Sequence, residues 1–135
     1  MNKQVLQPTG WAQPRGYANG VAATGRQVFV AGQIGWNERC EFDSDDFIAQ
    51  VRQALLNIRA VLAEAGATPE HIVRMTWYLI DKREYISRGR EVGQAYREVL
   101  GRGYGIAMSA VQVAALMEDR AKVEIEVTAV IPDVT

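Results

Sequence analysis

Residues 122–130 read KVEIEVTAV, and this stretch decides the fold because apolar residues occupy every second position. They share one side of a predicted strand: Val123, Ile125, Val127 and Ala129. Glu124 and Glu126 lie on the opposite side, together with Thr128. A strand with two such different sides buries one of them. The two acids are therefore either solvated strand residues or part of a site between subunits.

An amphipathic helix is predicted from Ser44 or Asp45 to Ala65. Its apolar residues recur at steps of three and four: Phe47, Ile48, Val51, Ala54, Leu55, Ile58, Val61, Leu62 and Ala65. Acidic residues suit its amino end, and Gly66 suits its carboxyl end. A helix with one apolar stripe must pack on an apolar surface, and the apolar side of the last strand supplies one.

The rest of the chain supplies the other elements of this layer arrangement. Residues 1–16 are expected to be irregular, and two apolar runs around Thr24-Gly25-Arg26 predict a hairpin whose second strand ends near Gly32 and Gly35. A helical turn is expected at Thr68-Pro69-Glu70. Further elements are predicted at Ile72–Ile80 (strand), Arg83–Leu100 (helix), Ile106–Leu116 (strand) and Lys122–Ile131 (strand).

The predicted order is β-β-α-β-α-β-β in a single domain, residues 1–135, of the α+β class. Such an order indicates a mixed sheet with two helices on one face. The other face carries the acids of the last strand and small apolar residues of the strand before it. Because that face is too apolar to be fully solvated, we expect another copy of the chain to cover it.

Composition excludes several classes of function. The 15 basic residues balance 16 acidic ones, so the chain lacks the basic surface that nucleic-acid binding requires. The lone Cys40 excludes an internal disulfide and indicates a reducing, cytoplasmic location. The only histidine, His71, excludes a histidine metal cage. No apolar run is long enough for a membrane span, and we expect neither a metal nor a membrane partner.

Four separated blocks resemble, in this order, the reactive-intermediate deaminase (RidA/YjgF) family: RGYANGVAATGRQVFVAGQIG, QVRQALLNIRAVLAEAG, IVRMTWYLID and SAVQVAALMEDRAKVEIEVTAV. The resemblance extends from about Arg15 to Val130. It implies a chorismate-mutase-like fold, assembled as a homotrimer with three clefts between neighbouring subunits. Typical deaminating members hydrolyse a 2-imino or 2-enamino acid in each cleft and release ammonia and a 2-keto acid, with no metal or organic cofactor.

The resemblance also implies site residues. Tyr17, in RGY, falls on the pocket tyrosine of the family. Gly32, in AGQIG, falls on the glycine whose backbone lines the cleft. Glu124, the first glutamate of VEIE, falls on the carboxylate that holds or activates the attacking water. Taken alone, each of these residues has an ordinary structural explanation, and the match is what raises them to site candidates.

Among the departures from the family pattern, two concern the expected substrate contacts. The arginine that binds the substrate carboxylate is replaced by Met108, and the pocket cysteine is replaced by Ala110. A guanidinium donates two parallel charge-assisted hydrogen bonds to a carboxylate, each worth about 1.5–3 kcal/mol, whereas a thioether has neither charge nor donor. We therefore expect activity on small 2-imino acids to fall by orders of magnitude. Four arginines are candidate replacements: Arg15, Arg88, Arg90 and Arg102.

The leading hypothesis is an imine or enamine hydrolase that acts on a small molecule other than the usual 2-imino acids, with aminomuconate-like compounds among the candidates. Glu124 is its expected base, while Tyr17, Gly32, Met108 and Ala110 are its expected substrate contacts. The alternative is a non-catalytic trimer that binds a metabolite or a partner protein. A ribonuclease activity, ascribed to some relatives, fits poorly with the balanced charge.

Overall fold

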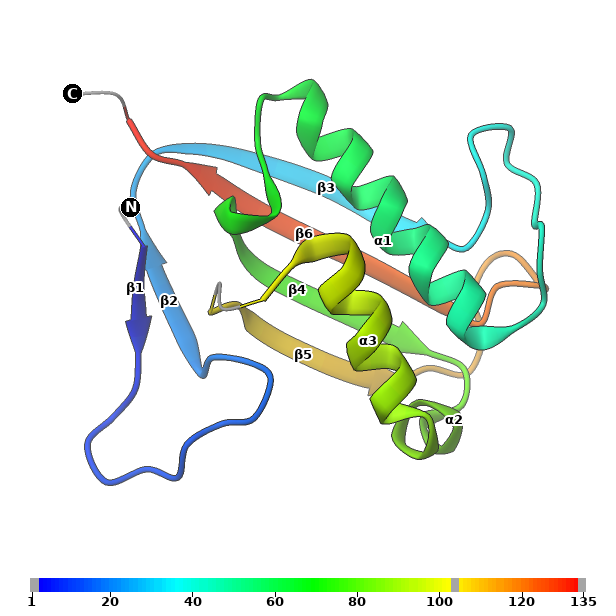
Figure 1. Cartoon of the computed structure of the whole chain (residues 1–135), viewed down its shortest axis with the longest axis horizontal. Helices are drawn as coiled ribbons and strands as arrows, with labels where there is room; N and C mark the ends of the chain where they lie inside the picture. The colour runs from blue at the N-terminus through cyan, green and yellow to red at the C-terminus, as the bar shows by residue number, and fades with distance from the viewer. Residues whose placement is uncertain (1–2, 103–104, 134–135) are drawn as a thin grey trace.

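The computed structural model describes residues 3–102 and 105–133. Its elements are β1 (Lys3–Leu6), β2 (Gly20–Ala23), β3 (Arg26–Ile34), α1 (Phe47–Glu64), the 3-10 turn η1 (Pro69–His71), β4 (Ile72–Leu79), α2 (Lys82–Ser87), α3 (Gly89–Leu100), β5 (Ala107–Gln112) and β6 (Val123–Ile131). Figure 1 shows helices α1 and α3 lying across one face of the main sheet. The expected α+β architecture with a mixed sheet is thereby confirmed.

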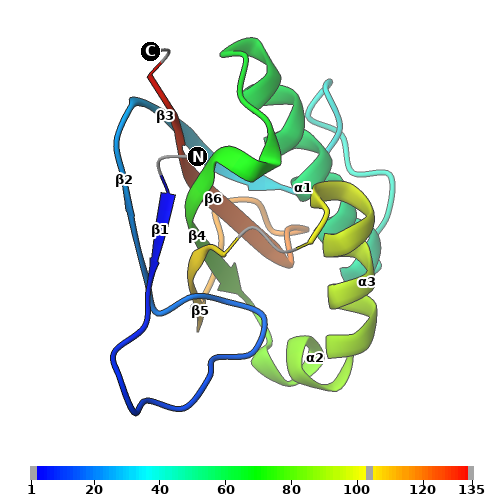
Figure 2. The same ribbon diagram turned by 60° about the vertical axis from the view of Figure 1, so that its left-hand side comes forward.

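The main sheet has the strand order β3-β6-β4-β5. Strand β6 pairs antiparallel with both β3 and β4, whereas β4 and β5 are parallel because the α2–α3 segment crosses over between them. Figure 2 shows all the helices on the same side of this sheet. The last strand of the chain therefore lies inside the sheet, where both of its edges are hydrogen-bonded.

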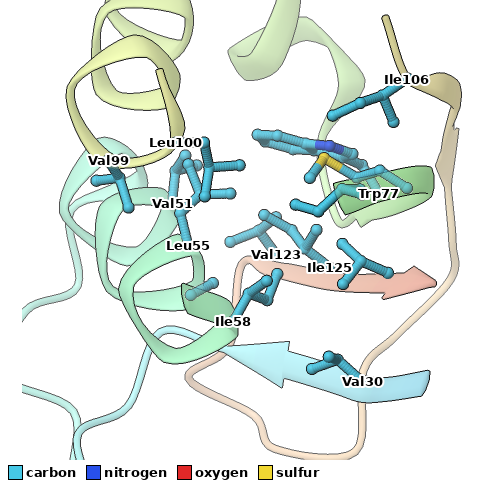
Figure 3. Close-up of a cluster of buried hydrophobic side chains, with 14 of the residues drawn as sticks. Val30, Val51, Leu55, Ile58, Trp77, Val99, Leu100, Ile106, Val123 and Ile125 are labelled. Atoms are coloured by element: carbon cyan, nitrogen blue, oxygen red, sulfur yellow. The ribbon is translucent and has the colours of Figure 1, made fainter. Parts of the chain in front are cut away.

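The alternation of residues 122–130 decides which side of the sheet is buried. Val123, Ile125, Val127 and Ala129 are buried against the helices, while Glu124, Glu126 and Thr128 are half-buried on the other side. The apolar stripe of α1 packs onto this layer, and Figure 3 shows Leu55 and Ile58 close to Val123 and Ile125. Burial of these side chains is the main source of stability. No helix of the described residues covers the opposite face of the sheet, and we call it the open face.

Helix α1 begins and ends close to the predicted positions. Asp46 is its N-cap, and its carboxylate accepts a hydrogen bond from the backbone N–H of Ala49 at 3.0 Å. Gly66, with φ of 75°, follows the last turn at Ala65, where a residue with a side chain would be strained. Asp46 also links α1 to the junction of α2 and α3, because its other carboxylate oxygen, Oδ1, lies 3.0 Å from Arg88 Nη1.

We expect Asp46→Ala to lower the free energy of unfolding at neutral pH by about 1 kcal/mol, the usual worth of an N-cap. The hydrogen bond from Ala49 and the Arg88 guanidinium lower the pKa of Asp46 below its ordinary value. A lowered pKa in the folded state gives stability that is complete above the unfolded pKa of about 3.9 and is lost as pH falls through the folded pKa. The deficit of the variant should therefore shrink below about pH 4.

Urea denaturation at neutral and acidic pH measures this difference, and Asp119→Ala serves as control, because Asp119 is exposed and has no ion pair among the residues described. An equal deficit at both pH values would contradict the electrostatic part of the explanation.

The predicted hairpin around Gly25 is wrong. Strand β2 pairs with β1, with Lys3 opposite Ala23 and Leu6 opposite Gly20, and forms a separate two-stranded sheet. Strand β3 pairs instead with β6, beginning with Arg26 opposite Ile131. Gly25, at φ of 147°, lies against the Ile131 carbonyl, so the chain passes there from one sheet into the other. Residues 1–16, expected to be irregular, thus contain strand β1.

The second predicted helix is in fact two helices. The break falls at Arg88, whose φ of −105° and ψ of 25° end α2 before α3 begins at Gly89. Arg88 also donates hydrogen bonds to Glu91 and Asp46, which hold the junction against α1. The strand predicted at Ile106–Leu116 is shorter than expected and ends as β5 at Gln112.

Candidate functional site

The open face carries the polar residues of β6 and β4 side by side. The register places Glu124 opposite Tyr78, Glu126 opposite Thr76 and Thr128 opposite Arg74, and it continues this face onto β5 with Ala107, Ser109 and Val111. Strand β3 pairs with the other edge of β6. There Phe29 lies opposite Thr128, on the same face, and is 71% exposed. The face thus combines two acids, one guanidinium and several hydroxyl groups with exposed apolar side chains.

Glu124 and Gly32, two of the site residues implied by the resemblance, lie in direct contact. A β-bulge between Val30 and Gln33 interrupts the pairing of β3 with β6 and places Gly32 beside the acid. A side-chain carbon built onto Gly32 would lie 2.7 Å from Cδ and 2.8 Å from Cγ of Glu124. The Glu124 carboxylate therefore rests on bare backbone, half-buried, and makes no hydrogen bond or ion pair with any residue that the structure describes.

Gly32→Ala should consequently displace the Glu124 side chain, because no real Cβ atom tolerates such contacts. We expect this variant to lose most of whatever function depends on the position of Glu124, while a shift of one flexible side chain leaves the fold intact. A crystal structure of the variant, with ligand binding or turnover measured beside it, tests the expectation. Gly89→Ala is a suitable control because a Cβ at Gly89 meets nothing within 4 Å. An unmoved Glu124 in the variant would contradict the prediction.

Glu126 differs from Glu124 because it has a hydrogen-bond partner. The Tyr78 hydroxyl donates to Glu126 Oε1 at 2.6 Å. This bond, together with burial and the negative charges of Glu126 and Glu124, raises the pKa of Tyr78. The phenol therefore stays protonated as a donor, and it draws Glu126 toward β4 while Glu124 leans toward β3. Of the two acids, Glu124 is the one left available to an incoming molecule.

Met108 and Ala110 lie on the other side of the sheet. They pair with Met75 and Trp77 of β4, which are buried beneath the helices, and paired residues of parallel strands face the same way. Met108 is half-buried against the core, and Ala110 is exposed. Tyr17, 45% exposed, lies near them, because the backbone N–H of its neighbour Ala18 donates to the Ile106 carbonyl at 2.8 Å.

The predicted site residues thus form two groups in one chain. Glu124 and Gly32 lie on the open face, whereas Met108 and Ala110 lie on the helix side of the edge strand β5, and Tyr17 belongs to the chain segment beside that strand. A small molecule cannot contact both groups of the same chain, because the sheet separates them. This separation was not predictable from the order of residues in the sequence.

The structure also reduces the number of arginines that could replace the carboxylate-binding arginine of the family. Arg88 is held by Glu91 and Asp46, which raise its pKa above the ordinary value, so it serves the packing of the helices. Arg15, Arg90 and Arg102 are exposed. Sequence reasoning missed Tyr78 and Arg74, although their positions in the alternating stretch 72–80 place them on the same side as the open face of β6.

Among residues 3–102 and 105–133, no three His, Cys, Asp or Glu side chains lie close enough together to hold a metal ion. None of the helices described has the length and apolar character to cross a membrane.

Residues 11–131 match the family model described as Endoribonuclease L-PSP. This protein belongs to that family, the RidA/YjgF family. The solved structure of the Rid-family protein YyfB from Yersinia pestis is 32% identical, covers 97% of this chain and 100% of its own, and superposes with a TM-score of 0.84. The implied chorismate-mutase-like fold of the RidA/YjgF family is thereby confirmed.

Two other RidA/YjgF relatives bear on function. The 2-iminobutanoate/2-iminopropanoate deaminase of Salmonella typhimurium is 30% identical over 132 residues, which cover 96% of this chain and 98% of that protein. TdcF of E. coli, whose crystal structure contains bound serine, is 29% identical, covers 94% of this chain and 98% of its own, and has a TM-score of 0.67. The RidA/YjgF family therefore includes both a deaminase and a protein with a small-molecule ligand.

Proposed function

We propose that this protein hydrolyses an imine or enamine of a small molecule and releases ammonia, on a substrate other than the usual small 2-imino acids. The observation that carries the proposal is the Glu124 carboxylate, which rests on the bare backbone of Gly32 without a hydrogen-bond partner among the described residues. A carboxylate in that state is free to accept a proton from water. The cytoplasmic location expected from the sequence is part of the same proposal.

The site is proposed to form between copies of the chain, in a homotrimer. Glu124 and Gly32 would come from the open face of one copy, and Tyr17, Met108 and Ala110 from the β5 edge of its neighbour. The separation of these groups by the sheet supports this arrangement, and so does the exposure of Phe29 at 71% and of Val111 at 46% on the open face. Large apolar side chains exposed on one face, here on its two edge strands, are typical of a surface that another protein covers.

The reaction is hydrolysis of a protonated imine, whose nitrogen carries two hydrogens and the positive charge. Glu124 accepts a proton from water while the water oxygen bonds to the imine carbon, and the C=N double bond becomes a single bond. The protonated Glu124 then returns this proton to nitrogen. The C–N bond breaks as the hydroxyl oxygen forms the C=O double bond, and its remaining proton leaves with the nitrogen. Overall, one protonated imine and one water become one carbonyl compound and one ammonium ion.

Met108 defines which substrates are excluded. A carboxylate directly attached to the imine carbon finds no guanidinium at this position, where Met108 packs partly into the core. Each charge-assisted hydrogen bond that is lost costs about 1.5–3 kcal/mol of binding, and so small 2-imino acids should be poor substrates. This is the reason for proposing a different substrate class for the same chemistry.

Ammonia release tests the proposal. A panel of imines and enamines is generated freshly in the presence of the protein. The smallest member of the panel is 2-iminopropanoate, and the largest is an aminomuconate-type dienamine. Faster release from the dienamine, dependent on Glu124, is the expected result. Absence of Glu124-dependent release from any member of the panel would overturn the proposal. Sedimentation at micromolar concentration that shows a stable monomer would overturn the composite site.

The second candidate function is non-catalytic binding of a metabolite in the same clefts. The observation that favours it is Met108 at the anchoring position, and TdcF with bound serine shows that a relative holds a small ligand. A thermal-shift screen followed by recovery of the ligand distinguishes the two. A stabilising ligand that is recovered unchanged favours binding alone. A ribonuclease function has no comparable support, since the net charge is −1.

A further inference from the structure

Glu124 lies at the last position where β3 and β6 pair. After the bulge that follows Val30, the pairing of the two strands continues for two positions and ends with Ile34 opposite Glu124. A bulge disrupts the ladder locally, so β6 alone holds this end of β3, which contains Gly32, only weakly. The contact between the Glu124 carboxylate and the Gly32 backbone therefore needs support from outside the sheet.

The side chain of Asn57, in α1, holds this end of β3. Its Nδ2 donates to the Ile34 carbonyl at 3.2 Å and to the Trp36 carbonyl at 2.8 Å. The Gln53 side chain, about one turn earlier, donates from Nε2 to Asn57 Oδ1 at 2.8 Å and so fixes which way the Asn57 amide faces. The residue that lies opposite Glu124 in the register is thereby tied to the helix.

Gln50, also in α1, holds the start of β6. It is 1% exposed, and its Oε1 accepts a hydrogen bond from the backbone N–H of Lys122 at 2.8 Å. Its Nε2 donates to the carbonyl of Arg120 at 2.9 Å and to that of Ser44 at 3.1 Å. The donors and the acceptor of this buried amide are thus all in use. Because Lys122 stands two residues before Glu124, these bonds fix the backbone from which β6 begins.

Gln50 also packs against the end of β3, at Gly35. A side-chain carbon built onto Gly35 would lie 2.5 Å from Cβ and 2.6 Å from Cγ of Gln50, so only bare backbone fits there. The two carbonyls that Asn57 binds lie on either side of Gly35 in the chain. Gln50 and Asn57 are about two turns apart on one side of α1. Helix α1 therefore holds both strands that meet at Glu124, β3 through residues 34–36 and β6 through residues 120–122.

We propose that Gln50 and Asn57 are positioning residues, which keep the Glu124 carboxylate on Gly32 by fixing the ends of β3 and β6 to α1. The inference rests on the proposed function, because a base must hold its water against the imine carbon. Helix α1 lies on the face of the sheet opposite the Glu124 side chain (Figure 1), so both amides act on Glu124 through the backbone. Hydrogen bonds suit this role because they are directional, whereas apolar contacts are not.

Gln50→Met and Asn57→Leu test the inference, because each variant keeps the approximate shape of the side chain and removes its hydrogen bonds. A displacement of about 1 Å at a catalytic group can cost about 10²-fold in rate, so kcat for ammonia release should fall by about 10-fold to 10²-fold. KM should change less than kcat. Crystal structures of the variants should show the Glu124 carboxylate displaced from Gly32. Asn57 is half-buried, so Asn57→Leu should fold even if Gln50→Met does not.

Leu62→Ala is the control for a loss of stability without a loss of position. Leu62 is fully buried on the same helix, about three turns from Gln50 and beyond Asn57. Measured at a temperature where every variant is folded, Leu62→Ala should be less stable than the unaltered protein and keep its kcat. An unchanged kcat in Asn57→Leu would overturn the inference, and so would an equal loss of kcat in Leu62→Ala.

Failure of the inference is separable from failure of the proposed function. If the unaltered protein shows Glu124-dependent ammonia release and Asn57→Leu keeps the same kcat, the hydrolase stands and the positioning role is removed. If no imine or enamine gives Glu124-dependent release, the proposed function fails and the crystal structures decide the inference. A carboxylate displaced from Gly32 in Asn57→Leu, with Glu124 unmoved in Leu62→Ala, then supports it, and an unmoved carboxylate in Asn57→Leu overturns it.

Discussion

Glu124→Gln is expected to lower kcat for imine or enamine hydrolysis by about 10²–10⁴-fold, the usual contribution of a positioned acid–base group. Glutamine has nearly the same shape but cannot accept a proton from water. The Glu124 side chain makes no hydrogen bond or ion pair with the described residues, so its replacement leaves no partner unsatisfied. The fold should therefore persist, and KM should change less than kcat.

Glu126→Gln is the matched control for this experiment, because it removes the same charge from the same face of the same strand. The amide oxygen of glutamine can still accept the hydrogen bond from Tyr78. Its effect on kcat should be much smaller, about tenfold or less by comparison with the range for a positioned base. Steady-state rates of ammonia release measure both variants. If Glu126→Gln proved as damaging as Glu124→Gln, the assignment of the base to Glu124 would be wrong.

Trp77→Ala is expected to lower the free energy of unfolding by about 3–5 kcal/mol, as large-to-small changes of buried aromatic residues do. Trp77 is 1% exposed, and its ring meets Tyr85 edge-on with a centroid distance of 5.8 Å. Figure 3 shows it within the cluster that joins the helices to the sheet. Its indole N–H has no hydrogen-bond partner among the described residues, so packing alone accounts for its contribution.

Trp11→Ala is the control for the loss of a tryptophan. Trp11 is 60% exposed, and its substitution should change stability by less than about 0.5 kcal/mol. Urea denaturation at one fixed protein concentration compares the variants, because association would make the midpoint depend on concentration. Similar losses for Trp77→Ala and Trp11→Ala would show that the core is not organised around β4 as described.

The sequence alone sufficed for the local elements and for which side of each is buried. The stripe of apolar residues in α1, its acidic start and the glycine after it place that helix within two or three residues. The alternation in β6 correctly assigns Val123, Ile125, Val127 and Ala129 to the core. These features are predictable because they arise from residues close together in the chain, which share one repeating backbone geometry.

The site was predictable only in part. The family resemblance identified Glu124 and Gly32, and the structure brings them into contact. The family resemblance gave no signal for Tyr78 or Arg74, because the position of these residues relative to the acids depends on the register between β4 and β6. The replacement of the family arginine by Met108 was visible in the sequence, whereas its position on the far side of the sheet was not.

What the sequence determined by itself was a set of two-sided elements and one candidate for a reactive acid, Glu124. Only the tertiary structure decided that β2 pairs with β1 instead of β3, that Tyr78 engages Glu126 and leaves Glu124 free, and that the site residues lie on opposite sides of one sheet. The physical reason is that a period of two fixes which way a side chain points but not which strand lies beside it. Partner and register come from contacts between distant segments, which no local pattern encodes.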